Sequence, residues 1–168
     1  MMRNNPMSNM YLQIDGIKGD STNAAHKDWI ELESYSHGVS QPVGASWSAQ
    51  GAHAGSIAQH SEFSFAKRLD SSSPTLCLYC CKGSAIKKVV FEISRPLGDQ
   101  TTFMKYTFTD CIVSGISTSG SASEADPVPM EQVSIRYSKI EWEYTPTDTK
   151  GKKQSAVKAS WDVSKNTV

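Results

Sequence analysis

Residues 129–146 read Pro129-Met-Glu-Gln-Val-Ser-Ile-Arg-Tyr-Ser-Lys-Ile-Glu-Trp-Glu-Tyr-Thr-Pro146. The apolar residues of this segment alternate in two runs whose parity differs by one residue: Val133, Ile135 and Tyr137, then Ile140, Trp142 and Tyr144. Alternation with period two indicates a half-buried strand, and a shift of one residue is what a β-bulge produces. Because a bulge bends and twists a strand, the segment predicts a long strand that curls around a barrel. None of these side chains is chemically reactive, which favours an assembly or binding role over an enzymatic one.

Composition supports a single β-rich domain without a nucleic-acid partner. The chain has 168 residues, a length typical of one domain. Lys plus Arg and Asp plus Glu both number 17, so the formal net charge is zero and the pI is about 6.9. The basic surface of a nucleic-acid-binding protein is therefore not expected. The 11 glycines, the abundant serine and a hydrophobic content of 38% indicate a turn-rich β protein.

The first ten residues, MMRNNPMSNM, lack the apolar run of a Sec signal. No later segment is apolar over the length needed to span a bilayer, so we expect synthesis in the cytoplasm and no membrane insertion. We interpret residues 1–9 as a disordered N-terminal extension and residues 10–168 as one domain.

The pattern of alternation and turn residues predicts about seven strands and one helix. Ser72-Ser73-Pro74 is typical of a helix start, and Gly83 ends that helix after Lys82. On it, Leu76, Cys77, Cys80 and Cys81 are expected to be buried. The strands are expected at residues 10–17, 29–38, 61–69, 87–95, 103–117, 129–144 and 157–166. Together these elements predict a mainly β protein, an antiparallel barrel or rolled sandwich with one short flanking helix.

No pattern of catalytic, metal or cofactor-binding residues is found. Cys77-x-x-Cys80 has no second Cys or His pair at ligand spacing, so these cysteines and Cys111 are expected to pack as small hydrophobic residues. The four histidines form no H-E-x-x-H motif, and we expect each of them to be a surface or core residue: His26, His37, His53 and His60. The segment from Ser114 to Gly120 lacks a Gly-x-Ser-x-Gly elbow, and no glycine-rich phosphate loop with a following Lys occurs.

Several motifs follow one another in a characteristic order along the chain. They are Tyr11-Leu-Gln-Ile-Asp-Gly-Ile-Lys-Gly-Asp-Ser21, His26, Ile30-Glu-Leu-Glu-Ser-Tyr-Ser-His-Gly-Val-Ser-Gln-Pro42, Phe63-Ser-Phe-Ala-Lys67, the Ser-Ser-Pro-Thr-Leu76 helix start, Val113-Ser-Gly-Ile-Ser-Thr-Ser-Gly120, Pro129-Met-Glu-Gln-Val-Ser-Ile135 and Trp161-Asp-Val-Ser-Lys-Asn166. In this order the set resembles the haemolysin-coregulated protein (Hcp) family, the tube protein of bacterial type VI secretion. The resemblance runs from about residue 10 to residue 166.

The resemblance implies a β-barrel of two sheets with one flanking helix, in which six copies close into a ring and the rings stack into a tube. It implies no catalytic residue, cofactor or metal. The implied partners are further copies of the chain, a spike protein at the tube tip, sheath and baseplate proteins, and effectors that the ring lumen carries and chaperones. The implied localisation is the extracellular medium or a target cell, reached by type VI secretion.

Two groups of residues are candidates for contacts of such a tube. Residues 41–59 form a long segment without a charged residue, and Trp47, His53 and Ile57 within it are the candidates for contact between stacked rings. Ser34, Ser36 and Gly38 share one face of an extended segment and are the candidates for lining the lumen and contacting effectors. The alternative for the second group is that these residues point into the core, because Ile30 and Leu32 have the same parity.

Two other functions fit the predicted fold. A monomeric ligand-binding barrel would bind a small molecule in its interior, and a phage-tail-tube-like protein would share the tube architecture. The size of the particle in solution distinguishes the first of these from a ring.

Overall fold

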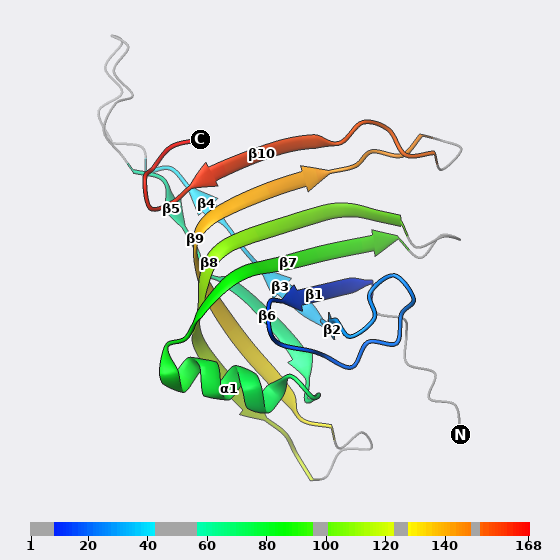
Figure 1. Cartoon of the computed structure of the whole chain (residues 1–168), viewed down its shortest axis with the longest axis vertical. Helices are drawn as coiled ribbons and strands as arrows, with labels where there is room; N and C mark the ends of the chain where they lie inside the picture. Colours follow the sequence, from blue (N-terminus) through cyan, green and yellow to red (C-terminus); the bar gives the residue numbers. More distant parts are fainter. Residues whose placement is uncertain (1–8, 43–56, 96–100, 123–127, 149–151) are drawn as a thin grey trace.

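The computed structural model describes residues 9–42, 57–95, 101–122, 128–148 and 152–168. The expected N-terminal extension lies outside the described residues except for Asn9, and so does most of the expected ring-stacking segment, residues 43–56. Within the described residues the protein is mainly antiparallel β structure with one helix, as the sequence predicts (Figure 1).

Eight strands form one antiparallel sheet. Its order is β2-β1-β7-β8-β9-β6-β3, and β10 pairs with the part of the same β9 edge that β6 leaves free. The strands β4 and β5 form a separate two-stranded ladder. The strands are β1 Met10–Ile14, β2 Ile30–Glu31, β3 Ser34–Ser36, β4 Val39–Ser40, β5 Gln59–His60, β6 Phe63–Arg68, β7 Ala85–Arg95, β8 Thr101–Ser119, β9 Met130–Tyr144 and β10 Val157–Asp162. The helix is α1, Ser73–Lys82.

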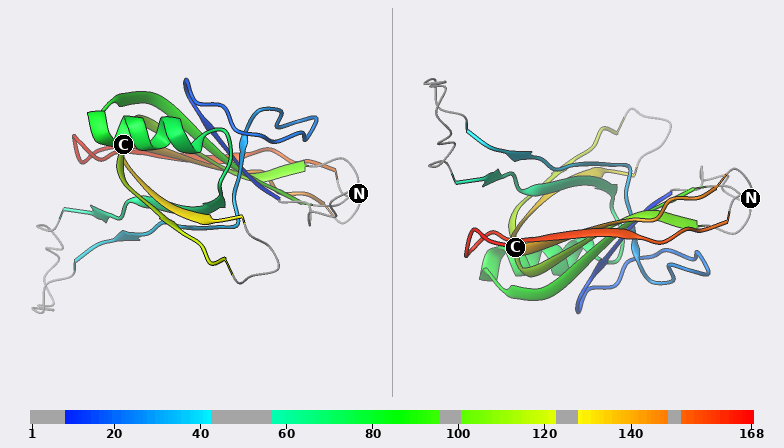
Figure 2. Two further views of the ribbon diagram at one scale, coloured as in Figure 1. Left: turned by 90° about the horizontal axis from the view of Figure 1, so that it is seen from below. Right: turned by 90° about the horizontal axis from the view of Figure 1, so that it is seen from above.

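The long strands β8 and β9 belong to both walls of the curled sheet. One half of each strand lies with β7, β1 and β10, and the other half lies with β6 and β3. Seen end on in Figure 2, the sheet folds over on itself and encloses the core between its two walls.

The β-bulge predicted from the parity shift between Tyr137 and Ile140 is wrong. Thr109 pairs with Lys139 and Cys111 with Tyr137, so the register between β8 and β9 is unchanged across this point. Instead, Asp110 adopts a left-handed conformation with φ 51°, and both strands change the face that they turn to the core at the same place. The bulge lies in β8, between Val113 and Gly115.

The core is filled by aliphatic and aromatic side chains from both walls. Phe63, Phe65, Phe91 and Phe108 have no exposed surface, and the ring of Phe63 lies within 5.8 Å of each of the other three. On β9 both runs of the alternation face this core, because Val133, Ile135 and Ile140 are fully buried and Tyr137 and Trp142 pack against them.

The helix begins and ends where the sequence predicts, with Ser72 at the N-cap and Gly83 in a left-handed conformation after its end. Leu76 is fully buried and Cys80 packs on the core, as expected. The expected burial of Cys77 and Cys81 is wrong, because both thiols are exposed. The helix places Ser73, Leu76 and Cys80 toward the sheet. Cys77 and Cys81, each one position further along the chain, therefore lie on its outer side.

The strand expected at residues 29–38 is interrupted. Leu32 and Glu33 separate β2 from β3, and the chain changes its paired neighbour from β1 to β6 across them. This break inverts the parity of the segment, since Leu32 is buried whereas Ser34 is exposed.

Candidate functional site

Small polar residues cover one face of the wall made by β3, β6, β9 and β8. Ser36 lies opposite Ser64, which lies opposite Ser134, and Ser134 pairs with Gly115. The hydroxyls of Ser64 and Ser134 are 3.0 Å apart. Because directly opposed residues share a face of an antiparallel sheet, these four residues form one row across four strands.

A second row runs parallel to the first. Ser34 lies opposite Ala66, which lies opposite Gln132, and Gln132 pairs with Ser117. All members of both rows are exposed or half-buried, and none is a large apolar residue. We call these two rows the small-residue face; it carries hydroxyls and an amide without an apolar patch.

The side chains between these rows point to the opposite face. Tyr35 lies opposite Phe65, and its ring centroid is 4.6 Å from that of Phe91. His37 stacks edge-on to Phe108 at 6.2 Å. Ser34 and Ser36 therefore lie on the face away from the core, and the alternative in which they point into the core is wrong. Gly38 is also exposed and stands at the start of the β4–β5 ladder.

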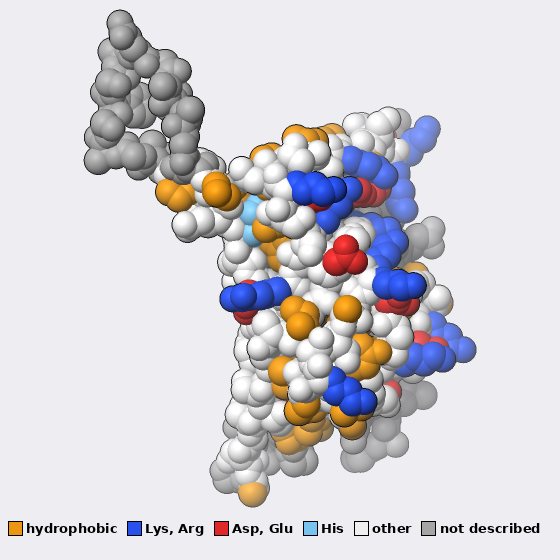
Figure 3. All heavy atoms as spheres, turned by 60° about the vertical axis from the view of Figure 1, so that its left-hand side comes forward, with side chains coloured by type: hydrophobic (Ala, Val, Ile, Leu, Met, Phe, Trp, Pro, Cys, Tyr) orange, Lys and Arg blue, Asp and Glu red, His pale blue; other side chains and the backbone are white. Residues whose placement is uncertain are grey.

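The β4–β5 ladder carries the chain away from the barrel (Figure 2). Val39 pairs with His60 and Ser40 with Gln59, so the two arms of the expected ring-stacking segment are antiparallel at their root. Ile57 is 67% exposed, whereas Trp47 and His53 lie outside the described residues. Figure 3 shows histidine side chains, in pale blue, at the foot of this projection.

At that foot, His37, His60 and Tyr137 form a cluster that we call the His–Tyr cluster. The Tyr137 hydroxyl oxygen lies 2.6 Å from Nε2 of His37 and 3.5 Å from Nδ1 of His60. Burial, and then the proximity of His60, lower the pKa of His37 below 6.5. Burial also lowers the pKa of His60, and it raises that of Tyr137, so the cluster is neutral at neutral pH.

The start of β9, six residues before Tyr137, carries a buried ionic network, which we call the Lys67 network. The Lys67 ammonium is fully buried and lies 2.7 Å from a carboxylate oxygen of Asp70 and 2.8 Å from one of Glu131. It also donates to the Ser73 hydroxyl at 2.9 Å and to the Arg68 carbonyl at 3.1 Å. The Ser73 hydroxyl in turn donates to Glu131 at 2.7 Å, so the network joins the first residue of α1 to β6 and β9.

One strand edge of the sheet carries exposed apolar side chains. The strand β10 pairs only with β9 among the described strands, and Val157 on it is 67% exposed. Its partner Tyr144 is 42% exposed. Ala159 is exposed and pairs with Trp142, which is half-buried. An unpaired edge with apolar side chains beside it is typical of a surface that another chain covers.

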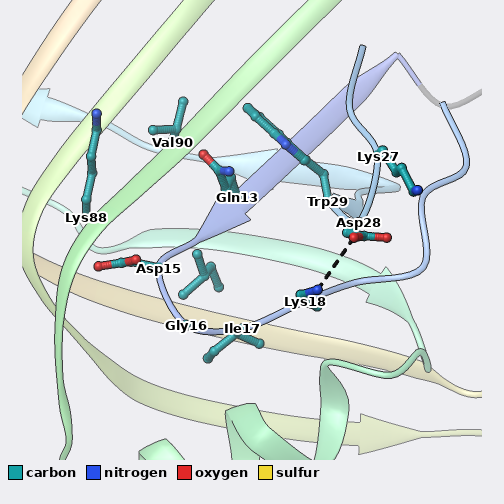
Figure 4. A pocket seen from close by; sticks show the side chains of 11 residues that line it. Gln13, Asp15, Gly16, Ile17, Lys18, Lys27, Asp28, Trp29, Lys88 and Val90 are labelled. Atoms are coloured by element: carbon teal, nitrogen blue, oxygen red, sulfur yellow. Dashed lines mark ion pairs between the residues drawn. The ribbon is translucent and has the colours of Figure 1, made fainter. Parts of the chain in front are cut away.

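A hollow of about 510 Å³ lies on the outer surface, between β1, the loop that follows it and β7 (Figure 4). Trp29 and Val90 lie among polar residues there, and Lys18 closes one side by an ion pair of 3.7 Å with Asp28. Lys88 lines the other side. Ion pairs this exposed are weak, and the hollow lacks the convergent titratable groups of a catalytic site.

Residues 9–42, 57–95, 101–122, 128–148 and 152–168 contain no group of three or more His, Cys, Asp or Glu that could hold a metal ion. In the same part of the chain, no helix is long and apolar enough to cross a membrane.

The sequence interpretation missed both polar clusters on β9, since it treated His37 and His60 as ordinary surface or core histidines. A signal for the Lys67 network was present. Lys67 continues the alternation of Phe63 and Phe65, and Glu131 continues that of Val133, so opposite charges stand at core positions of two strands. The His–Tyr cluster left no such signal, because its members are far apart in the sequence and β3 inverts its parity.

Comparisons with known proteins agree with one another. The model of the family described as "Type VI secretion system effector, Hcp" matches residues 11–144. Protein hcp1 of Pseudomonas aeruginosa is 29% identical over 159 residues, which cover 94% of this chain and 96% of that protein. Among solved structures, a type six secretion system protein is similar with a TM-score of 0.87 at 29% identity, covering 94% of this chain and 96% of the other. Hcp1 from Salmonella typhimurium is similar with a TM-score of 0.75 at 28% identity, with the same coverage.

Proposed function

The chain belongs to the Hcp family of type VI secretion, and we propose that it is a structural tube subunit whose six-membered rings stack into an inner tube. The observation that carries this proposal is the uncovered apolar edge at β10, with Val157 67% and Tyr144 42% exposed. A head-to-tail contact closes into a ring when the rotation between subunits fits. A second copy of the chain that covers this edge would satisfy both its backbone groups and its apolar side chains.

The small-residue face suits the lumen of such a ring. Its hydroxyls offer weak hydrogen bonds to a passing protein, and the absence of large apolar side chains in its rows keeps that protein from binding tightly. Ser34, Ser36 and Gly38 lie at one margin of the face and remain our candidates for contact with effectors, which the lumen would carry and chaperone.

The β4–β5 ladder suits the contact between rings, because it projects from the barrel and Ile57, two residues before β5, is exposed. In this proposal Trp47, His53 and Ile57 contact the adjacent ring. Residues 10–168 act as one unit, and the chain is secreted by the type VI system, with spike, sheath and baseplate proteins as further partners.

A monomeric ligand-binding barrel is less well supported. The interior that a ligand would occupy is filled by four phenylalanines without exposed surface: Phe63, Phe65, Phe91 and Phe108. The hollow beside β1 and β7 lies outside the barrel and is lined by both polar and apolar side chains. A phage-tail-tube-like role shares the architecture and is distinguished by the type VI partners.

Light scattering coupled to size exclusion, followed by electron microscopy, tests the ring. We expect hexamers with a central opening for the unmodified chain, and smaller species for Val157→Glu, which places a charge on the apolar edge. Ser160→Glu is the matched control, because Ser160 lies on the other face of the same strand. A monomeric wild-type protein would overturn the proposal, and hexamers of Val157→Glu would exclude β10 as the contact.

Replacing residues 43–56 by a tight turn tests the stacking contact. We expect rings that no longer form tubes. Tubes from the shortened protein would exclude the projection as the contact, and loss of the rings would assign it to the subunit interface instead.

A further inference from the structure

The two histidines of the His–Tyr cluster stand where the β4–β5 ladder joins the barrel. His37 precedes β4 by two residues, and His60 is the last residue of β5. Between them, the Gly38 amide donates to the Ser61 hydroxyl at 2.7 Å, and the Ser61 amide donates to the Gly38 carbonyl at 2.9 Å. These two hydrogen bonds close the root of the ladder.

Tyr137 ties that root to the barrel. It belongs to β9, and its hydroxyl contacts both histidines and donates to the Ser61 carbonyl at 3.1 Å. Tyr137 lies one hundred residues after His37, so the contact joins the ladder to a strand that is remote in the chain. One side chain of the barrel therefore holds both arms of the ladder.

A proton on either histidine would enter an environment without a counter-charge. The rings of Tyr106, Phe108 and Tyr137 surround His37 at centroid distances of 5.8–6.2 Å, and Trp142 and Tyr137 lie at 6.4 and 6.2 Å from His60. Within the described residues, no carboxylate makes a hydrogen bond or ion pair with either ring. The nearest acidic side chain along the chain, Glu62, is paired with Arg136 at 2.6 Å.

The tyrosine and cysteine side chains packed around the cluster are neutral. Burial raises the pKa of Tyr106 and of Tyr137. Behind Tyr137, burial and then the nearby Asp110 raise the pKa of the Cys111 thiol to about 12. Near neutral pH the aromatic groups that contact both histidines are thus uncharged, and among the described residues neither Asp110 nor Glu62 forms a hydrogen bond or ion pair with either ring. Protonation of one histidine would also repel a proton on the other.

We propose that the His–Tyr cluster is a pH-sensitive latch, which holds the β4–β5 ladder on the barrel at neutral pH and releases it in mildly acidic solution while the barrel stays folded. The ladder consists of two residue pairs, so few other hydrogen bonds hold its root in place. The core of the barrel contains neither histidine.

The sign of the pH dependence follows from the direction of the shifts. The pKa of His37 and that of His60 are lower with the ladder attached than the ordinary value of 6.5. The attached form therefore binds fewer protons than the released form. Its full stability is present above pH 6.5, falls as the pH drops below 6.5, and levels off below the pKa of the attached form.

Amide hydrogen exchange of the full chain at about pH 7.5 and about pH 5 tests the latch. After correction for the intrinsic exchange rate, we expect the protection of the Gly38 and Ser61 amides to fall by about tenfold. The amides of β7 should keep their protection, because the barrel stays folded. Unchanged protection of Gly38 and Ser61, or an equal loss in β7, would overturn the proposal.

The double variant His37→Gln, His60→Gln supplies the control. Gln stays neutral at both pH values, so the pH dependence of the Gly38 and Ser61 amides should disappear; a dependence equal to that of the wild type would assign the titration to other groups. Should the variant fail to fold, the titration of the wild-type His37 ring by NMR decides the question. A midpoint clearly below 6.5 supports the latch, and one at or above 6.5 contradicts it.

One consequence rests on the proposed function. If the ladder stacks the rings, tubes should separate into rings in mildly acidic solution. Amide exchange at the ladder root is measured on unstacked protein and does not depend on stacking. If the exchange shows the latch but the tubes stay intact at acidic pH, only the stacking role of the ladder is rejected.

Discussion

The strand β9 places a polar core-facing residue on either side of Val133 and Ile135, and these two polar residues are held in different ways. Glu131 belongs to the Lys67 network, in which Lys67 and Glu131 are buried and every partner is in hydrogen-bonding distance. Tyr137 belongs to the His–Tyr cluster, which is half-buried and neutral. The first fastens α1 to the sheet, and the second fastens the β4–β5 ladder to it.

The sheet therefore holds one element permanently and another under certain solution conditions only. A buried ion that loses its partner costs several kcal/mol, so the Lys67 network has no inexpensive open state. A neutral hydrogen bond contributes only about 1 kcal/mol, and protonation can offset it within the physiological pH range. The helix is therefore fixed to the barrel, whereas the attachment of the ladder depends on solution conditions.

The largest effect is expected from Lys67→Met. This change leaves the buried Glu131 and the half-buried Asp70 without their cation, and we expect the free energy of unfolding to fall by about 3–5 kcal/mol in urea denaturation. Arg136→Met is the control, since the Arg136 side chain is 73% exposed and its ion pair with Glu62 should contribute about 1 kcal/mol or less. Equal losses for the two variants would remove the distinction between a buried and a surface ion pair.

The next effect concerns the packing of the helix that this network positions. Leu76 is fully buried, and Leu76→Ala should lower the free energy of unfolding by about 2–5 kcal/mol. Leu78→Ala, two residues further on the same helix, should change it by about 0.5 kcal/mol or less because Leu78 is 48% exposed. Melting curves that shift equally for both variants would show that α1 does not bury the face assigned to it.

A smaller effect is expected at the conditional attachment. Tyr137→Phe removes only the hydroxyl that joins the two histidines and Ser61, and we expect a loss of about 1 kcal/mol at neutral pH. Faster amide exchange should be confined to the root of the ladder. Tyr144→Phe is the control, since it also removes only a hydroxyl and Tyr144 is 42% exposed. The free energy of unfolding of this variant should stay within about 0.5 kcal/mol of the wild-type value. Global unfolding of Tyr137→Phe would place the cluster in the core instead.

The sequence predicted the fold well where local patterns decide the structure. Alternation located the long strands, serine, proline and glycine located α1, and the order of motifs predicted the Hcp family, which the family model confirms. Local patterns failed where distant segments meet. The bend shared by β8 and β9 arises at Asp110 and looks like a bulge from β9 alone. His37 and His60 come together at Tyr137 only because β3 pairs with β6, which the local sequence does not show.

The smallest effect on folding is expected on the small-residue face, at Ser36→Arg. Ser36 points away from the core, so a long charged side chain can extend into solvent, and the free energy of unfolding should change by about 0.5 kcal/mol or less. Tyr35→Ala, one residue earlier, should cost more, because it removes the contacts with Phe63 and Phe91. If the face lines a lumen, as proposed, Ser36→Arg rings should keep their size in light scattering but retain an effector less well than Ser36→Ala rings, since arginines would narrow the opening and charge it. Loss of the ring in Ser36→Arg would place Ser36 in a subunit contact, and unchanged retention would exclude it as a lumen residue.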